Sequence, residues 1–407
     1  MIFIFEFSMK KLFFFSLMLA SLGAIADVEF SQALPDVKIN EIQVLGTHNS
    51  YAQKVDPKLL QMVDPIFEKI IPEFMKKMTP EQAALFHEEH PHEIKMTEAL
   101  SYSHPDLKTQ LESGLRSLEI DVNPDPAGGN FLDPAGYRVL KQKGVSESQL
   151  EPFDTTDLDK PGFKVLHIAD IDFRSNCPTF KICLSKLKSW SLEHPGHIPV
   201  FIMLEAKTDT IPVLPNPTKI TPLTPELFDV LDQEIVSVLG RERLITPDDL
   251  LGRYATLRQA SAAKNWPKLS DSRGKFIFLM ITANGPESTK MYLKDHPSLK
   301  GRVAFLRAMP GEDHAAFLLL DNASVRKADI QKYVSEGYLV RTRTDIETFE
   351  AKVNDPTMAE AAFASGAQVV STDFPWESNV YGTSYRVRLP GGSVARCNPV
   401  VRLKCAQ

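Results

Sequence analysis

Polar residues that could perform acid–base and metal chemistry follow or end four apolar, strand-like segments of the sequence. They are His48 and Asn49 after the first segment, Glu119 and Asp121 within the second, His167 after the third, and Glu205 at the end of the fourth. Two histidines can act as an acid–base pair. Three carboxylates and one amide form an oxygen-only ligand set that suits Ca²⁺ or Mg²⁺ rather than zinc. Carboxylates gathered at one place also repel one another unless a cation lies among them.

This combination of groups fits the cleavage of a phosphate diester. A bound metal ion would lower the pKa of an attacking hydroxyl and neutralise the phosphate, while one histidine takes a proton and the other protonates the leaving oxygen. Each signal is weak alone, because a histidine at a strand end is usually structural and Glu-x-Asp is a common surface pattern. Together they favour phosphodiester chemistry, because strands rarely end in ionisable groups unless these are paired.

The elements that must position these residues alternate along the chain. Short apolar, β-branched runs recur at Ile42–Leu45, Ser117–Val122, Phe163–His167, Val200–Glu205, Phe276–Ile281, Val303–Leu306, Leu339–Thr342 and Gln368–Ser371. With helical patterns between them, these runs predict a (β/α)₈ barrel of the TIM type, whose active site lies at the carboxyl ends of the strands. An open, doubly wound sheet is the alternative. No GxGxxG follows the first strand, which argues against a dinucleotide site.

Helix start signals support the alternation. Thr224 before Pro225 predicts a helix that runs to Leu239, with Thr224 as its N-cap. The segment 246–249 has the form of a capping box and opens another helix. A further helix is expected to begin at residue 355 or 357 and to end at Gly366.

Two long insertions follow predicted strands and should lie at the mouth of the barrel. Residues 52–100 contain helical segments, and residues 208–225 form a proline-rich loop. Either insertion could wall the site or touch a membrane. We expect one apolar set in the first insertion to be buried core rather than membrane surface: Met62, Phe67, Ile70, Ile71, Phe74, Met75 and Met78.

Several motifs together resemble the catalytic barrel of the phosphoinositide-specific phospholipases C. They are Thr47-His48-Asn49-Ser50-Tyr51, Arg116-Ser117-Leu118-Glu119-Ile120-Asp121, the strand-end His167, and Ile202-Met203-Leu204-Glu205. The stretches from Phe180 to Glu205 and from Ala364 to Pro375 resemble the secreted, calcium-dependent bacterial branch in detail. The resemblance extends over roughly residues 38–380 and implies a barrel-type phosphodiesterase.

The resemblance also implies roles for individual residues. The calcium ligands would be Asn49, Glu119, Asp121 and Glu205, with Mg²⁺ as a possible substitute. His48 and His167 would form the catalytic pair that cleaves phosphatidylinositol-type lipid to diacylglycerol and a cyclic inositol phosphate. We expect His167 to protonate the leaving glycerol oxygen and His48 to contact the phosphoryl group. The general base stays open between His48, Glu119 and Glu205. Metal-independent relatives have Asp after the first histidine, so Asn49 favours a metal-bound site.

Four further residues are candidates for substrate binding. Lys207 points the same way as Glu205 and either meets phosphate or is a solvated lysine. Arg341 and Arg343 could bind inositol hydroxyls or phosphate, and a structural pairing with Asp345 is the alternative. Asp373 follows the last strand and could hold Arg343 or a substrate hydroxyl.

Two other functions compete with this one. A glycerophosphodiester phosphodiesterase, or another phospholipase-type barrel, also uses two histidines and Glu-x-Asp. In that class the first histidine is typically followed by Arg, whereas here it is followed by Asn49. The other competitor is a non-catalytic barrel that binds lipid or sugar, and the full set of strand-end acids and histidines argues against it.

The N-terminus and the cysteines predict export. Residues 1–26 have the basic, apolar and small-residue regions of a signal peptide, with a membrane anchor as the alternative. Residues 27–407 would then form one catalytic domain with the insertion 52–100 and a disulfide-pinned tail, exported to the periplasm or secreted. The simplest pairing joins Cys177 to Cys183 and Cys397 to Cys405, and a zinc site is the competitor.

Composition excludes other partners. The 407 residues are 43% hydrophobic and 24% charged, which are ordinary values for a globular protein. The formal net charge is −6 and no run of five like charges occurs, which argues against nucleic-acid binding. No later stretch is apolar over 18 residues, so no transmembrane segment is expected in the mature chain. We expect a monomer that meets its phospholipid substrate at a membrane surface.

Overall fold

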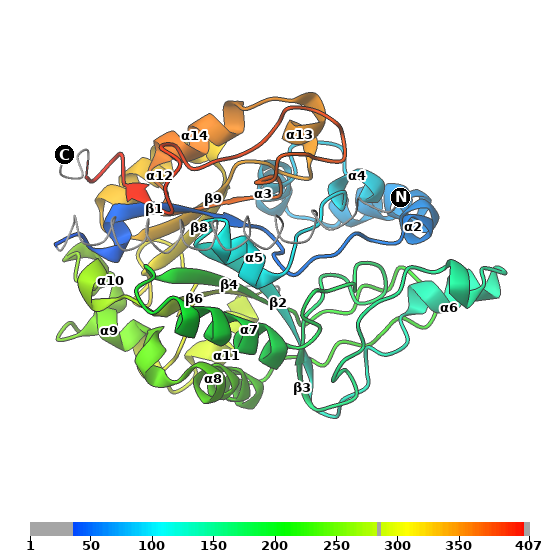
Figure 1. Ribbon diagram of the computed structural model, residues 1–407, viewed down its shortest axis with the longest axis horizontal. Helices are drawn as coiled ribbons and strands as arrows, with labels where there is room; N and C mark the ends of the chain where they lie inside the picture. The colour runs from blue at the N-terminus through cyan, green and yellow to red at the C-terminus, as the bar shows by residue number, and fades with distance from the viewer. Residues whose placement is uncertain (1–35, 283–285, 403–407) are drawn as a thin grey trace, which may run out of the picture.

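Eight parallel strands form a TIM-type barrel in the computed structural model, which describes residues 36–282 and 286–402 (Figure 1). They are β1 (Ile42–Thr47), β2 (Ser117–Asp125), β4 (Val200–Ala206), β6 (Phe276–Thr282), β7 (Phe305–Leu306), β8 (Phe317–Asn322), β9 (Leu339–Arg343) and β10 (Val369–Thr372). In the order β7-β6-β4-β2-β1-β10-β9-β8, each strand pairs with the next. A single bridge between Arg307 and Phe317 joins β7 to β8. The predicted fold class is therefore confirmed.

The prediction of a third barrel strand at Phe163–His167 was wrong. Residues Gly162–Lys164 form β3, which pairs antiparallel with Asn123–Asp125 at the far end of β2 and lies outside the ring. The barrel position is taken instead by β8, whose sequence Phe-Leu-Leu-Leu-Asp-Asn has no β-branched residue and gave no strand signal. The other seven predicted segments coincide with barrel strands. Two more short strands, β5 (Leu244–Ile245) and β11 (Arg396–Cys397), pair with β6 and β1.

Helices lie around the sheet, with α7, α8 and α11 on one side and α12 and α14 on the other (Figure 1). Their bounds are α5 (Leu107–Glu112), α6 (Ala135–Gln142), α7 (Phe180–Glu193), α8 (Pro225–Leu239), α9 (Pro247–Leu251), α10 (Leu257–Ala262), α11 (Pro286–Leu293), α12 (Ala323–Ser335), α13 (Phe349–Val353) and α14 (Thr357–Ser365). The predicted caps are confirmed. Thr224 caps α8, residues 246–249 form a capping box at α9, and Gly366 ends α14 in the left-handed conformation.

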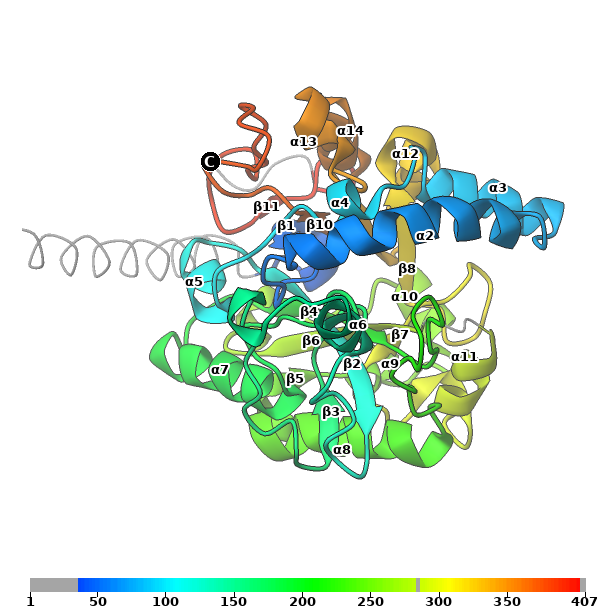
Figure 2. The ribbon, with the colours of Figure 1, turned by 90° about the vertical axis from the view of Figure 1, so that its right-hand side faces the viewer.

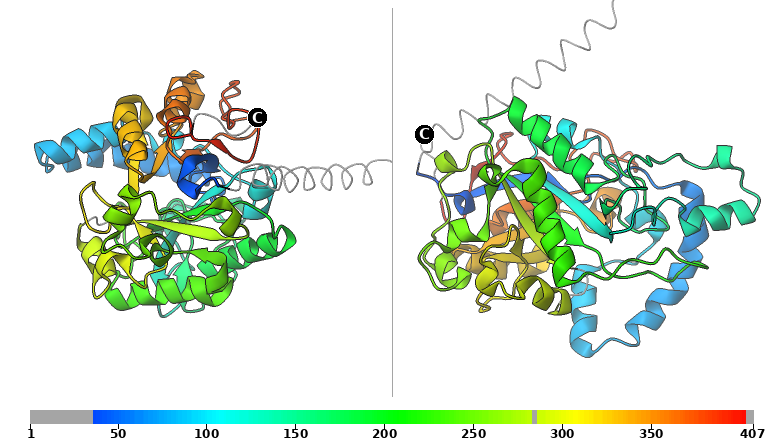
Figure 3. Two further views of the ribbon diagram at one scale, coloured as in Figure 1. Left: turned by 90° about the vertical axis from the view of Figure 1, so that its left-hand side faces the viewer. Right: turned by 90° about the horizontal axis from the view of Figure 1, so that it is seen from below.

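The first insertion crosses the mouth of the barrel. It contains α2 (Pro57–Met75), α3 (Pro80–Glu89) and α4 (Met96–Ala99), and begins directly after β1. The end of α3 is fixed to the β8 side of the barrel, because Arg326 lies 3.0 Å from Glu88 and Asn322 Nδ2 donates to the Glu88 carbonyl. Beyond this contact α2 and α3 extend outward from the barrel (Figures 2 and 3).

The expected apolar set of this insertion is core only in part: Met62 and Phe67 pack against a buried cluster, whereas the expectation was wrong for Ile70 and Phe74. Phe74 is 57% exposed and Ile70 is 40% exposed, and the other five members of the set are only half-buried. The outer parts of α2 and α3 pass beyond the barrel, and within residues 36–282 and 286–402 nothing covers Ile70, Phe74 and Leu85, which are all exposed.

The disulfide between Cys177 and Cys183 is confirmed. Cys177 lies before α7, and Cys183 lies within it. Cys405 lies outside the described residues, so its bond to Cys397 stays a prediction, as does the signal peptide at residues 1–26. None of the helices in residues 36–282 and 286–402 has both the length and the apolar character needed to cross a lipid bilayer.

Candidate functional site

The turn after β1 is held by close packing and by a buried hydrogen-bond network. A Cβ atom on Gly46 would lie 2.2 Å from the Ser117 carbonyl oxygen, so only glycine allows this approach of β1 to β2. Thr47 Oγ1 lies 2.6 Å from both Ser50 Oγ and Gln110 Oε1, and Gln110 Nε2 donates to the Ser50 carbonyl. These contacts fix the turn that carries His48 and Asn49.

Asn49 is placed beside the acidic residues by the same turn. Its φ is 44°, in the left-handed region that asparagine tolerates better than most residues. Asn49 Nδ2 donates to Tyr102 Oη at 2.6 Å, which turns the amide oxygen away from Tyr102. The Glu119 amide donates to Ser50 Oγ at 2.8 Å, so this turn and β2 are directly joined.

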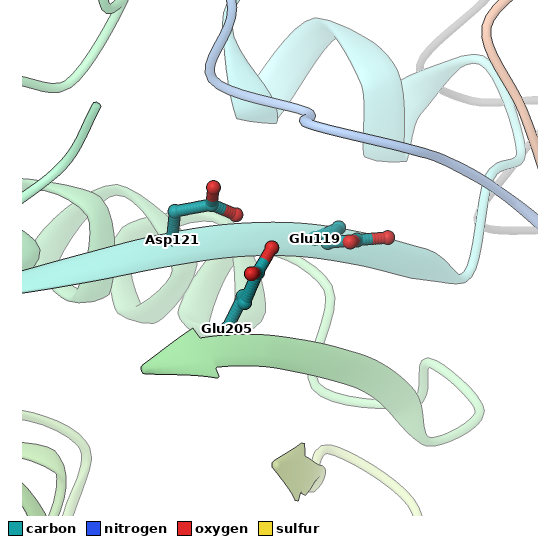
Figure 4. A group of neighbouring side chains, drawn as sticks. All are labelled: Glu119, Asp121 and Glu205. Atoms are coloured by element: carbon teal, nitrogen blue, oxygen red, sulfur yellow. The ribbon is translucent and has the colours of Figure 1, made fainter. Parts of the chain in front are cut away.

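Three carboxylates converge beside the first half of β2 and the carboxyl end of β4 (Figure 4). Glu119 and Asp121 share one face of β2, as their alternation predicted, and Glu205 is the register partner of Asp121 on β4. One oxygen from each lies within 4.8 Å of the others. Glu119 and Asp121 are almost fully buried. The structure therefore brings together three of the four predicted ligands, with the Asn49 turn bonded to the same strand.

Two of these carboxylates share the ammonium of Lys207. Nζ lies 3.0 Å from Asp121 Oδ2 and 2.8 Å from Glu205 Oε1. Burial raises the pKa of Asp121 to about 7, although Lys207 opposes this. Burial also opposes the ionised form of Glu205, but the Lys207 charge outweighs it and lowers the Glu205 pKa. From the sequence, Lys207 was expected either to contact phosphate or to be solvated, and neither expectation included this pairing with two carboxylates.

The third carboxylate is held by an arginine from the opposite wall. Arg341 Nη2 lies 2.8 Å from Glu119 Oε2, and Nη1 pairs with Asp321. Arg341 is 2% exposed, and its ion-pair partners are Glu119 and Asp321 rather than Asp345, the structural partner considered from the sequence. Arg341 is therefore positioned to hold the Glu119 carboxylate in place. A direct contact with substrate stays a prediction.

His48 is oriented by a carboxylate on the neighbouring strand. Its Nδ1 lies 3.0 Å from Asp373 Oδ1, and Arg343 Nη2 lies 3.0 Å from Asp373 Oδ2. A carboxylate only accepts, so Nδ1 carries the proton and Nε2 of the neutral ring is left with its lone pair. Burial and the Arg343 charge hold the pKa of His48 well below its usual range. The predicted link between Arg343 and Asp373 is thus present.

His167 has the same kind of partner but reaches the mouth from a loop, not from a strand end. Nδ1 donates to Asp172 Oδ2 at 2.9 Å, and the backbone amide of His167 donates to the Asp172 carbonyl. Burial disfavours the charged ring, but the hydrogen bond and charge of Asp172 outweigh it and raise the pKa of His167. Asn123 Nδ2 ties the loop to β2 through the Leu166 carbonyl.

A hollow of about 260 Å³ opens beside these groups. Its polar wall includes His167, Glu205 and Lys207, and its other wall is largely apolar. The apolar wall includes Ile168 and Ile171 from the loop after His167, and Ile211, Val213 and Ile220 from the proline-rich loop. The second insertion therefore does wall the site.

Comparison with known proteins identifies the family of the chain. Residues 37–399 match the family model described as phosphoinositide phospholipase C, Ca²⁺-dependent. The chain belongs to this family. The match spans most of the sequence and confirms the resemblance inferred from its motifs.

The fold is shared with a solved structure from Pseudomonas sp.. A calcium-dependent phosphoinositol-specific phospholipase C from Pseudomonas sp. aligns with a TM-score of 0.51 at 16% identity, covering 91% of this chain and 99% of that one. The Ca²⁺-dependent phosphatidylinositol-specific phospholipase C of Streptomyces antibioticus aligns with a TM-score of 0.48 at 17% identity, covering 83% and 95%. The search of curated proteins finds no match.

The residues present fit a calcium ion. Calcium takes carboxylate and amide oxygens, and these three carboxylates converge beside the Asn49 turn. Both oxygens of Asp121 are buried and accept no well-aligned hydrogen bond, so its charge is balanced only in part by Lys207. A divalent ion would satisfy them.

Several functional contacts were not found from the sequence. Asp172, Asp321, Tyr102 and Gln110 hold the residues that were found. Asp172 lies five residues after His167, and an acidic residue in the turn after a candidate histidine is the one local signal that could have identified it. Asp321 and Gln110 act across long sequence separations, which a single sequence does not reveal.

Calcium should stabilise the wild-type protein and have a much smaller effect on Asp121→Asn, because the substitution removes the most buried ligand charge. At a calcium concentration a hundredfold above Kd, binding contributes about 2.7 kcal/mol to stability. Thermal melts in calcium and in chelator measure this. Exposed Glu336→Gln is the control and should respond like wild type. Equal responses of Asp121→Asn and wild type would contradict the metal site.

Proposed function

We propose that the protein is a calcium-dependent phospholipase C that cleaves phosphatidylinositol-type phospholipid to diacylglycerol and a cyclic inositol phosphate. One observation supports this above the others: His48 and His167 are each held through Nδ1 by a carboxylate, and each is near the acidic cluster. A histidine–carboxylate pair alone does not mark a catalytic residue, because His90 Nδ1 also lies 2.6 Å from Glu347 Oε1. Two of them beside a metal-type site fit the two proton transfers of phosphodiester cleavage.

Asn49, Glu119, Asp121 and Glu205 would hold the calcium ion. When bound, calcium would supply positive charge to the phosphate and lower the pKa of the attacking hydroxyl. Arg341 would keep Glu119 in place, and its own second partner, Asp321, keeps the guanidinium there. The residues of this chain thus form the site before the substrate enters.

The two histidines would then carry out the proton transfers. The inositol 2-hydroxyl attacks phosphorus, and its proton passes to Nε2 of neutral His48. The bond between phosphorus and the glycerol oxygen breaks, and that oxygen takes a proton from His167. The lowered pKa of His48 supports the role of base, and the raised pKa of His167 supports the role of acid. Arg343 and Asp373 lie beside His48 and would bind inositol hydroxyls.

The product of cleavage tests this function. Phosphorus NMR of the mature protein with phosphatidylinositol vesicles and calcium should show a cyclic inositol phosphate, and chelator should abolish the signal. His48→Ala and His167→Ala should each lower kcat by about 10²–10⁴-fold, the typical contribution of acid–base catalysis. Circular dichroism checks that both variants fold.

The other outcomes separate the competing functions. Glycerol phosphate from glycerophosphodiesters, without cleavage of phosphatidylinositol, would replace this function by the related one. Cleavage that persists in chelator would remove the metal from the mechanism and keep the histidine pair. Binding of vesicles without any turnover would favour a non-catalytic barrel.

Asp172 should set the alkaline limit of activity. The reaction needs protonated His167, so activity is lost as the pH rises through the pKa of this histidine. Asp172 raises that pKa. Asp172→Asn should therefore shift the alkaline limb of kcat/KM to lower pH, because the neutral amide stabilises the imidazolium less. A pH–rate profile measures the shift. An unchanged limb would show that His167 is not the acid.

We also propose that the open apolar surface of Ile70, Phe74 and Leu85 meets the lipid bilayer. These residues belong to helices that leave the mouth of the barrel, and Ile211, 42% exposed, lies on the other insertion there. The chain would reach this bilayer after export. The Cys177–Cys183 disulfide supports an oxidising compartment.

Phe74→Ser combined with Ile70→Ser should weaken binding to vesicles of phosphatidylinositol and phosphatidylcholine by about tenfold or more, because each side chain transfers apolar area to lipid. Vesicle sedimentation measures binding, and turnover of a soluble inositol phosphodiester should stay unchanged. Leu192→Ser is the matched control, since Leu192 is 56% exposed at the end of α7, away from the mouth. An equal loss in both would exclude a local docking surface.

A further inference from the structure

Lys207 occupies an unusual position for a lysine. It follows the last residue of β4, and its backbone amide donates to the Val122 carbonyl, which extends the pairing with β2. Its side chain is 16% exposed and points into the acidic cluster, where Nζ contacts Asp121 and Glu205. A tethered cation therefore already lies between two of the carboxylates that would bind calcium.

The charges around this position leave room for a divalent ion as well. Glu119, Asp121, Glu205 and Asp321 face two cations, Lys207 and Arg341. With all four acids ionised, two negative charges remain uncancelled, which equals the charge that one calcium ion supplies. The cluster with Lys207 in place is thus a site whose charge is not yet balanced.

Calcium and the ammonium cannot hold the same oxygens in their present arrangement. Calcium contacts its oxygen ligands at about 2.3–2.6 Å, and Lys207 Nζ is 3.0 Å from Asp121 and 2.8 Å from Glu205. An ion bound to both carboxylates would lie close to Nζ and repel it. The lysine stem is flexible, so the ammonium can withdraw without a change in the backbone.

The hollow beside the cluster offers the ammonium a second partner. Lys207 lines it together with His167. If His167 protonates the leaving oxygen, the phosphate diester must lie within reach of that ring and hence of Lys207. The phosphate would supply a negatively charged partner for the ammonium after it leaves Asp121 and Glu205.

We propose that Lys207 is an exchangeable counter-ion: it neutralises Asp121 and Glu205 in the calcium-free enzyme and passes to the substrate phosphate when calcium occupies the site. This inference rests on the proposed function. It makes calcium and phosphate ester binding mutually supportive, because each removes a competitor of the other. Without the lysine, calcium would bind to freer carboxylates, and only the direct attraction between calcium and phosphate would couple the two ligands.

Calcium affinity and its coupling to a phosphate ester test the exchange. Isothermal titration of the mature protein should show that Lys207→Met binds calcium about tenfold tighter than wild type, whereas Lys207→Arg, which keeps the charge, should stay near wild type. Wild type should bind myo-inositol 1-phosphate at least about fivefold tighter with calcium than with chelator. Lys207→Met should show a smaller difference than wild type, because only the direct attraction between calcium and phosphate remains.

Lys164→Met is the matched control, because Lys164 is also buried and lies 3.6 Å from Asp125, on β2 beyond the acidic cluster. Its calcium affinity should equal that of wild type. If Lys207→Met does not fold, nitrogen-15 NMR of the lysine ammonium groups in wild type gives the same information. The Lys207 signal should shift on addition of calcium and again on addition of the phosphate ester.

Each result separates this inference from the proposed function. Calcium affinity that is unchanged or weaker in Lys207→Met, or a Lys207 signal indifferent to calcium, would overturn the exchange while wild-type cleavage of phosphatidylinositol still stands. A wild-type protein that binds no calcium, together with a Lys207→Met variant that binds none, would overturn both the exchange and the metal in the proposed function.

Discussion

The crowding of three carboxylates on two adjacent strands is the constraint from which the rest of the site follows. The parallel register of β2 and β4 makes Asp121 and Glu205 direct neighbours, and the two-residue period adds Glu119. Buried charge is costly unless it is paired, so cations must surround the cluster. Arg341 supplies one from the opposite side of the ring, on β9, and Lys207 supplies another from the end of β4. The closed barrel is what brings these two walls within reach of one another.

The two histidines show how one arrangement can give two acidities. Both rings present Nδ1 to an aspartate, which fixes their orientation. His48 also lies near the guanidinium of Arg343, and burial together with that charge lowers its pKa. At His167 burial also lowers the pKa, but the hydrogen bond and the charge of its own aspartate together outweigh burial, and the pKa rises. Under the proposed function, this difference in pKa would suit the two histidines to opposite halves of acid–base catalysis.

The sequence predicted what depends on local pattern and missed what depends on contacts between distant segments. The acidic pair on β2 follows from alternation, and the helix caps follow from Thr and Pro signals. The β8 strand was missed because its leucines carry no strand signal, and Asp321 was missed with it. Residues Phe163–His167 were predicted as a barrel strand because an apolar run does not reveal which strand it pairs with. In the structure, β3 pairs antiparallel with the end of β2 that extends beyond the barrel. The exposure of Phe74 depends on where α2 ends relative to the barrel, which periodicity alone does not give.

The first insertion ties the proposed docking surface to the catalytic turn. It begins a few residues after His48 and Asn49, and Tyr102, two residues beyond its end, accepts the hydrogen bond from Asn49 Nδ2. Between these two ends, Glu88 on α3 is bound by Arg326 at the start of α12. The insertion is thus joined to the barrel at its ends and through α3, and Ile70, Phe74 and Leu85 lie between its start and the Glu88 contact. Contact with a bilayer through Phe74 would therefore set the distance between the lipid surface and the acidic cluster. Under the proposed function, that distance would help to bring the substrate headgroup to the buried carboxylates.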